Sequence, residues 1–106
     1  MVNPDEEREA REYTIRGRVQ GVGFRWWSRV TAEGLGLTGS VRNFPDGSVG
    51  LRVAGPVEIL DRFDTLLRRG PSSARVDDVQ VKVLSGPAEA APEDPVLAVD
   101  GFRIEP

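Results

Sequence analysis

The chain has 106 residues, enough for one domain with its own core, and it contains neither cysteine nor histidine. These two absences exclude disulfides, cysteine and histidine nucleophiles, histidine general bases and nearly all zinc sites. The formal net charge of −3 comes from residues 1–12, which hold five acids and two arginines. The rest of the chain is neutral, which argues against a protein that binds nucleic acid by neutralising phosphates. No apolar run is long enough for a signal peptide or a membrane span, so we expect a soluble cytoplasmic protein.

The first third of the chain predicts a tail, a strand and a helix. Residues 1–12 lack apolar periodicity, so we expect a flexible charged tail followed by one domain over 13–106. Alternation over 13–19 predicts a half-buried strand. Apolar residues at three- and four-residue spacing over 24–35 predict an amphipathic helix, stopped by a glycine. Its predicted buried stripe contains Phe24, Trp27 and Val30.

The remaining patterns complete an α+β fold. Strands are predicted at 37–44 and 48–54, joined by a hairpin turn at Pro45-Asp46-Gly47. The order β-α-β-β-α-β is typical of a ferredoxin-like sandwich, an antiparallel sheet with both helices on one face. The other predicted segments are a helix opened by Pro56 and closed before Gly70, a strand at 76–84, a loop at 86–95 and a short last strand at 97–104.

Residues 15–25, IRGRVQGVGFR, place a strand end, a Gly-x-Gly turn and a helix start together. Glycines allow successive backbone N–H groups to converge on one point, and a helix N-terminus adds a partial positive charge. Arg25 adds a fixed fork of donors suited to phosphate or carboxylate oxygens. The stretch therefore predicts an anion cradle, most simply for phosphate. A lone Gly-x-Gly would equally fit a plain turn with a solvated arginine, and neither the dinucleotide fingerprint nor the nucleotide P-loop is present.

Two further residues invite a functional and a structural interpretation. Asn43 ends a predicted strand before the hairpin turn, where asparagine commonly bonds to local backbone. The predicted topology would bring it near the glycine loop, and the sequence alone leaves that distance open. Trp26 lies off the buried stripe beside Arg25, and either lines a site there or is an incidental exposed aromatic.

Several segments together resemble the two sequence signatures of acylphosphatases: GRVQGVGFR at 17–25, GLTG at 36–39, and VRN at 41–43 followed by DGSV at 46–49. The resemblance implies hydrolysis of the carboxyl–phosphate bond of small acyl phosphates, without metal or cofactor. It implies that Arg25 binds the phosphate and that Asn43 orients the attacking water. The phosphate cradle it implies consists of the backbone N–H groups of Gln20, Gly21, Val22, Gly23, Phe24 and Arg25. We expect a monomer without nucleic-acid or membrane partners.

Two positions depart from the family pattern, and other functions stay open. Ser40 stands where an aromatic residue is usual, and Gly50 stands where a polar side chain is common and weakens its strand. One alternative is a domain that acts on carbamoyl phosphate or binds phosphate without catalysis. Another is an RNA-binding module with the same element order, although the strand at 48–54 lacks the stacking aromatics that such modules use. A regulatory small-molecule binder would not explain Arg25 together with Asn43.

Overall fold

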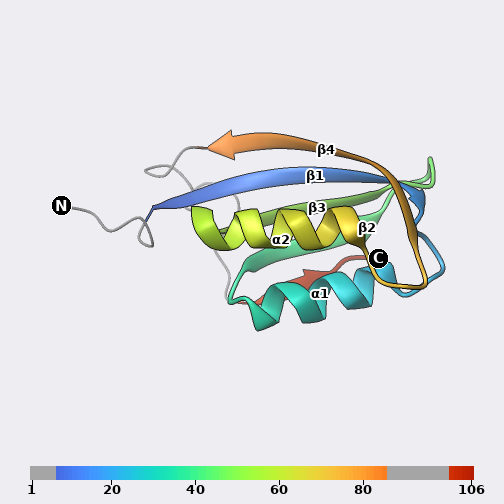
Figure 1. Ribbon diagram of the computed structural model, residues 1–106, viewed down its shortest axis with the longest axis horizontal. Coiled ribbons are helices and arrows are strands. Elements are labelled where there is room, and N and C mark those ends of the chain that lie inside the picture. Colours follow the sequence, from blue (N-terminus) through green and yellow to red (C-terminus); the bar gives the residue numbers. More distant parts are fainter. Residues whose placement is uncertain (1–6, 86–100) are drawn as a thin grey trace.

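Two helices lie on one face of a five-stranded sheet (Figure 1). The computed structural model describes residues 7–85 and 101–106. The predicted α+β ferredoxin-like fold is confirmed by the element order and the sheet. The strands are β1 (Arg8–Arg18), β2 (Thr38–Asn43), β3 (Val49–Pro56), β4 (Arg75–Ser85) and β5 (Phe102–Ile104), and the helices are α1 (Phe24–Gly34) and α2 (Val57–Arg69).

The strands lie in the order β4-β1-β3-β2-β5. Three of the pairings are antiparallel, as predicted, whereas β5 runs parallel to β2. Helix α1 packs over β2 and β5, and α2 packs over β1, β3 and β4. The C-terminal ends of β2 and β5 therefore lie beside the N-terminal end of α1, where the predicted phosphate loop enters the helix (Figure 1).

The prediction of a tail over 1–12 is wrong for residues 8–12, which form the first half of β1. The stretch has little apolar periodicity, and its buried Ala10 packs in a small cluster with Ala54 and Leu84, apart from the main core. Backbone pairing to both β3 and β4 holds this segment in the sheet. Ion pairs add to it, from Arg11 to Asp61 of α2 and from Arg52 of β3 to Glu12. A charged segment can thus be a central strand when its neighbours supply the partners.

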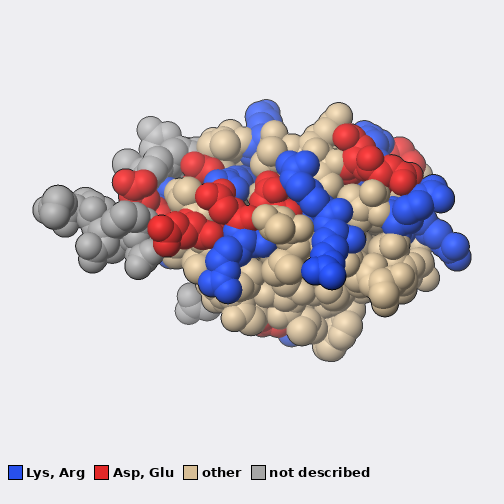
Figure 2. All heavy atoms as spheres, viewed as in Figure 1, with Lys and Arg blue, Asp and Glu red and all other residues tan. Residues whose placement is uncertain are grey.

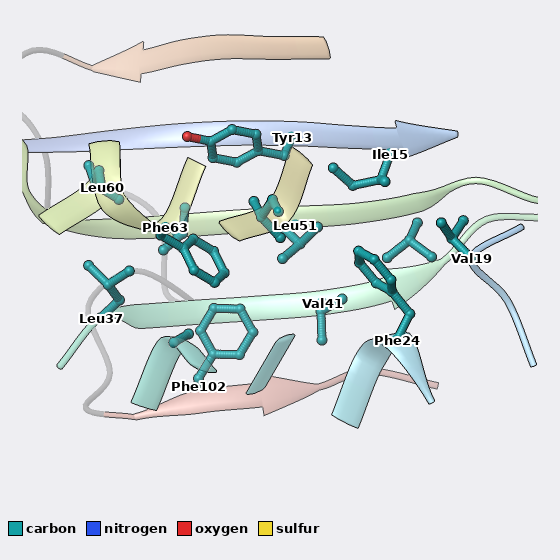
Figure 3. Close-up of a cluster of buried hydrophobic side chains, with 14 residues drawn as sticks. Tyr13, Ile15, Val19, Phe24, Leu37, Val41, Leu51, Leu60, Phe63 and Phe102 are labelled. Atoms are coloured by element: carbon teal, nitrogen blue, oxygen red, sulfur yellow. The ribbon is translucent and has the colours of Figure 1, made fainter. Parts of the chain in front are cut away.

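The core lies between the sheet and the helices (Figure 3). Phe63 of α2 meets Phe102 of β5 edge to face, with ring centroids 6.4 Å apart, and so ties the C-terminal strand to the second helix. Tyr13 lies under α2, and its hydroxyl donates to Asp64 at 3.1 Å. The largest fully buried side chains are Tyr13, Phe24, Phe63, Ile15, Leu37, Leu51, Leu60 and Leu67.

The predicted stripe of α1 is correct in part. Phe24 is buried and Trp27 packs against the core, but Val30 is 51% exposed. The buried positions of α1 are Phe24, Ser28 and Ala32, a row at i, i+4 and i+8, so the helix is rotated relative to the prediction. Small side chains on this row let the helix lie close to the sheet.

The structure also accounts for Gly50. A Cβ atom at Gly50 would overlap the ring of Phe44, which lies over this position of β3. The guanidinium of Arg42 stacks over the same ring, 5.2 Å from its centroid. Phe44 therefore fills the space that a side chain at position 50 would occupy.

The predicted loop at 86–95 and the start of the last predicted strand, 97–100, lie outside the described residues, as do residues 1–6. No described helix is long and apolar enough to cross a membrane. On the helix face, groups of acidic side chains alternate with groups of basic ones (Figure 2). The described part of this side therefore offers no single-sign field to a polyanion.

Candidate active site

The loop between β1 and α1 has the backbone that the glycines predict. Gly21 has φ 72° and Gly23 has φ 79°, both in the left-handed region that favours glycine. Since Val22 between them has no positive φ, the φ angle alternates in sign along the loop, and such alternation is typical of anion-binding loops whose neighbouring N–H groups point to a common centre. A Cβ atom at either glycine would meet no atom of residues 7–85 and 101–106 within 4 Å. Space above the loop is therefore open to a bound group.

The N-terminus of α1 is left without a capping side chain. Gly23 is the N-cap, none of the side chains that the structure describes bonds to the first-turn N–H groups, and the first turn holds no acid. Helix α2 differs, since Glu58 lies in its first turn. An uncapped N-terminus keeps its donors and its partial positive charge for an anion.

Gln20 ties the loop to the hairpin that follows Asn43. Its side-chain amide donates to the carbonyl of Phe44 at 2.7 Å and to the carbonyl of Ser48 at 2.8 Å. Both N–H groups of one amide are thus used to hold the two ends of the β2–β3 turn. The position of Asn43 relative to the loop is fixed by this clamp.

Asp46 stabilises the same hairpin from within. Its carboxylate accepts bonds from the hydroxyl of Ser48 at 2.6 Å and from the backbone N–H of Ser48 at 2.9 Å. Arg16 of β1 donates to its other oxygen at 3.0 Å. These bonds to Ser48, followed by the one from Arg16, lower the pKa of Asp46 to about 2.

Arg25 and Asn43 line one hollow of about 210 Å³. The sequence placed them 18 positions apart, on a helix and on a strand, and the structure brings them together. The phosphate-loop glycines are part of the same hollow, so the donors of the loop and the two polar side chains share it. The lining residues are Val19, Gly21, Gly23, Phe24, Arg25, Trp26, Asn43 and Ile104.

Arg25 is anchored from the far end of the chain. Its NH1 atom donates to the backbone carbonyl of Glu105 at 3.0 Å, just after β5. The N–H of Glu105 in turn donates to the carbonyl of Val41 at 2.8 Å, which continues the pairing with β2. One anchoring bond leaves the rest of the five-donor guanidinium fork for an anion.

Asn43 has a free acceptor. Its Oδ1 atom is buried and has no hydrogen-bond partner among the described residues. A buried acceptor without a partner is unfavourable by about 1–3 kcal/mol, and a bound water molecule would remove that penalty. The local backbone bond expected of an asparagine near a turn is absent at this oxygen.

Three contributors to the site were missed from the sequence. They are the side chain of Gln20, the carbonyl of Glu105, and the hydroxyl of Ser73, which donates to the loop carbonyl of Val22 at 2.8 Å. A carbonyl contact between residues 80 positions apart has no sequence signal. Ser73 lies in an ordinary polar turn, which carries no signal of a bond to Val22. Gln20 stands directly before Gly21, and nothing else in the sequence marks its side chain.

The lining of the hollow offers cationic and amide donors but no carboxylate or hydroxyl side chain among the described residues. Across residues 7–85 and 101–106, no three Asp or Glu side chains lie together as metal ligands would. Such a lining can bind a phosphate group and orient water. It supplies no side chain that accepts a proton readily at neutral pH.

This chain is similar to known proteins both in sequence and in structure. The family model described as Acylphosphatase matches residues 11–95. The acylphosphatase of Koribacter versatilis (strain Ellin345) is 44% identical over 100 residues, which cover 94% of this chain and 83% of that protein. The acylphosphatase of Nitratidesulfovibrio vulgaris (strain DP4) is 55% identical over 69 residues, 65% of this chain and 69% of its own. The solved acylphosphatase structure from Coxiella burnetii superimposes with a TM-score of 0.80 at 30% identity, covering 99% of this chain and 100% of that chain.

Proposed function

Because this chain belongs to the acylphosphatase family and hydrolyses the carboxyl–phosphate bond of acyl phosphates, we propose that Arg25 and Asn43 are its catalytic residues. Arg25 and the backbone N–H groups of residues 20–25 hold the phosphate, and Asn43 positions the attacking water. The observation that carries this assignment is that both side chains line one hollow, in which the Oδ1 atom of Asn43 has no hydrogen-bond partner among the described residues.

The proposed reaction is a direct displacement at phosphorus. The oxygen of the water bound to Asn43 forms a bond to phosphorus while the bond from phosphorus to the carboxyl oxygen breaks. The carboxylate leaves with the electron pair, and the proton of the water passes to an oxygen of the phosphate. Carboxylate is a good leaving group, so a site without a general acid suffices. The loose transition state of phosphoryl transfer needs mainly positioning and positive charge, which the loop, the helix N-terminus and Arg25 provide.

The size of the hollow and the charge of the chain also bear on the substrate and the partners. The substrate is a small acyl phosphate, since the hollow is smaller than the 300–1,000 Å³ typical of drug-sized ligand pockets. We propose a cytoplasmic monomer that acts without a nucleic-acid or membrane partner. Its neutral body and mixed surface charges support the absence of a polyanionic partner.

The test is phosphate release from a substrate panel in the presence of a chelator. Acetyl, benzoyl and carbamoyl phosphate are compared with simple phosphate monoesters, whose alkoxide leaving groups need a general acid. We expect turnover of acetyl and benzoyl phosphate and little turnover of the esters. Equal rates on the esters would contradict the mechanism, and a rate confined to carbamoyl phosphate would favour the narrower specificity over the general one.

A further inference from the structure

Two neighbouring tryptophans in the first turn of α1 have different environments. Trp27 packs on Phe24, with ring centroids 5.4 Å apart, and belongs to the core. Trp26 is 62% exposed, more than any other large hydrophobic side chain that the structure describes. An exposed aromatic is common on protein surfaces, so its exposure alone assigns no role. The location of Trp26, beside Arg25 and Asn43, does suggest one.

Trp26 lines the hollow that holds Arg25 and Asn43. Ile104 of β5, which runs parallel to β2, lines it as well. The hollow therefore has two parts of different chemistry. Loop N–H groups and the guanidinium take a phosphate, whereas Trp26 and Ile104 present apolar surface and no charge. An acyl phosphate bound through its phosphate can place its acyl group against Trp26 and Ile104, where the lining is apolar.

The indole ring of Trp26 is held in place by its own helix. The guanidinium of Arg29 lies 5.8 Å from the ring centroid, within the range of a cation–π contact. Arg29 is itself fixed by its Nε atom, which donates to Glu33 at 3.0 Å. One face of the ring thus has a partner, and the rigid ring loses little further entropy when a second flat group packs on it.

We propose that Trp26 binds the acyl group of the substrate, so that this chain prefers aromatic acyl phosphates to acetyl phosphate. The proposal rests on the function proposed above and adds the substrate class to it. An aromatic acyl group stacks on or against the indole ring and covers its exposed surface, while the acetyl group is too small to do so.

The first test measures kcat and KM for benzoyl and acetyl phosphate. In Trp26→Ala we expect KM for benzoyl phosphate to rise about fivefold, the scale of one aromatic contact, with kcat within about twofold of the original value. The ratio of the benzoyl to the acetyl kcat/KM therefore falls about fivefold. Trp26→Phe should restore most of this ratio. Val30→Ala is the matched control, since Val30 is also exposed on α1 but lies outside the hollow, and it should leave the ratio unchanged.

The second test measures binding without turnover. Phenacylphosphonate, in which a methylene group replaces the bridging oxygen of benzoyl phosphate, is titrated beside methylphosphonate. We expect Trp26→Ala to weaken phenacylphosphonate about fivefold and methylphosphonate much less. An unchanged substrate ratio together with unchanged phenacylphosphonate binding would overturn the proposal while leaving the hydrolytic function intact. Absence of turnover of either acyl phosphate by the original chain would instead contradict the proposed function.

Discussion

At the scale of single residues, Tyr13 shows how a polar atom is kept inside the core. It is the only tyrosine in the chain, and its ring is fully buried between β1 and α2. The hydroxyl donates to Asp64 and accepts a bond from Arg11 at 3.3 Å, so it joins the first strand to the second helix. Burial disfavours the phenolate and raises the pKa of Tyr13 to about 12.

The raised pKa predicts a loss of stability at alkaline pH. The unfolded chain has a tyrosine pKa of about 10, so the contribution of Tyr13 is complete below pH 10 and is lost as the pH rises through 12. The tyrosinate absorbance of the folded protein should titrate near pH 12, and that of the chain unfolded in urea should titrate near pH 10. Tyr13→Phe should remove this part of the pH dependence of unfolding. A folded protein whose tyrosine titrates near pH 10 would contradict the burial of this hydroxyl.

At the scale of elements, the site depends on how the loop, the hairpin and α1 are joined. The patterns of the sequence predict the helix and strand types well, because the alternation in β1 and the spacing in α2 follow burial. Val30 of α1 and Val81 and Val83 of β4 are exposed instead. They fail for the first half of β1, where the stabilising contacts are backbone pairing and ion pairs rather than apolar burial. They also give no reason for Gly50, because the ring that covers it comes from Phe44, beyond the end of β2.

The clamp by Gln20 provides a test at this scale. Gln20→Leu leaves the carbonyls of Phe44 and Ser48 without their side-chain donor, so we expect the free energy of unfolding to fall by about 1–3 kcal/mol. We also expect kcat on benzoyl phosphate to fall, because Asn43 is no longer held against the loop. Ser73→Ala is the control. It removes an exposed bond to Val22, and its unfolding free energy should stay within about 0.5 kcal/mol of the original. A Gln20→Leu enzyme with unchanged kcat would show that the clamp does not position Asn43.

At the scale of the whole molecule, the sheet order brings the last residues of the chain to the first helix. Strand β5 lies beside β2 at the edge of the sheet, and the carbonyl that follows it accepts a bond from Arg25. The fold class and the proximity of Arg25 and Asn43 could be expected from the strand–helix order and the resemblance. The hydrogen bond from Arg25 to the carbonyl of Glu105 could not be expected. Its acceptor is a backbone atom after a strand that runs parallel to β2, whereas the predicted sheet was antiparallel.

Removal of residues 105 and 106 tests this anchor. We expect KM for benzoyl phosphate to rise several-fold, because Arg25 loses its acceptor and a new terminal carboxylate lies near the bound dianion. Core packing should survive, since Phe102 remains. Glu105→Ala is the matched control, because it keeps the backbone carbonyl and alters only the side chain, and its KM should be unchanged. If the two variants behave alike, the carbonyl has no positioning role.

The separate roles of Arg25 in phosphate binding and of Asn43 in turnover are tested most directly by measuring both properties in Arg25→Ala and in Asn43→Ala. Inorganic phosphate is titrated as a competitive inhibitor or by calorimetry, and kcat is measured on benzoyl phosphate. We expect Arg25→Ala to lose both phosphate binding and nearly all turnover. Asn43→Ala should keep phosphate binding and lose turnover by a factor on the order of a hundred. An Arg25→Ala enzyme that turns over benzoyl phosphate at nearly the original rate would contradict the account.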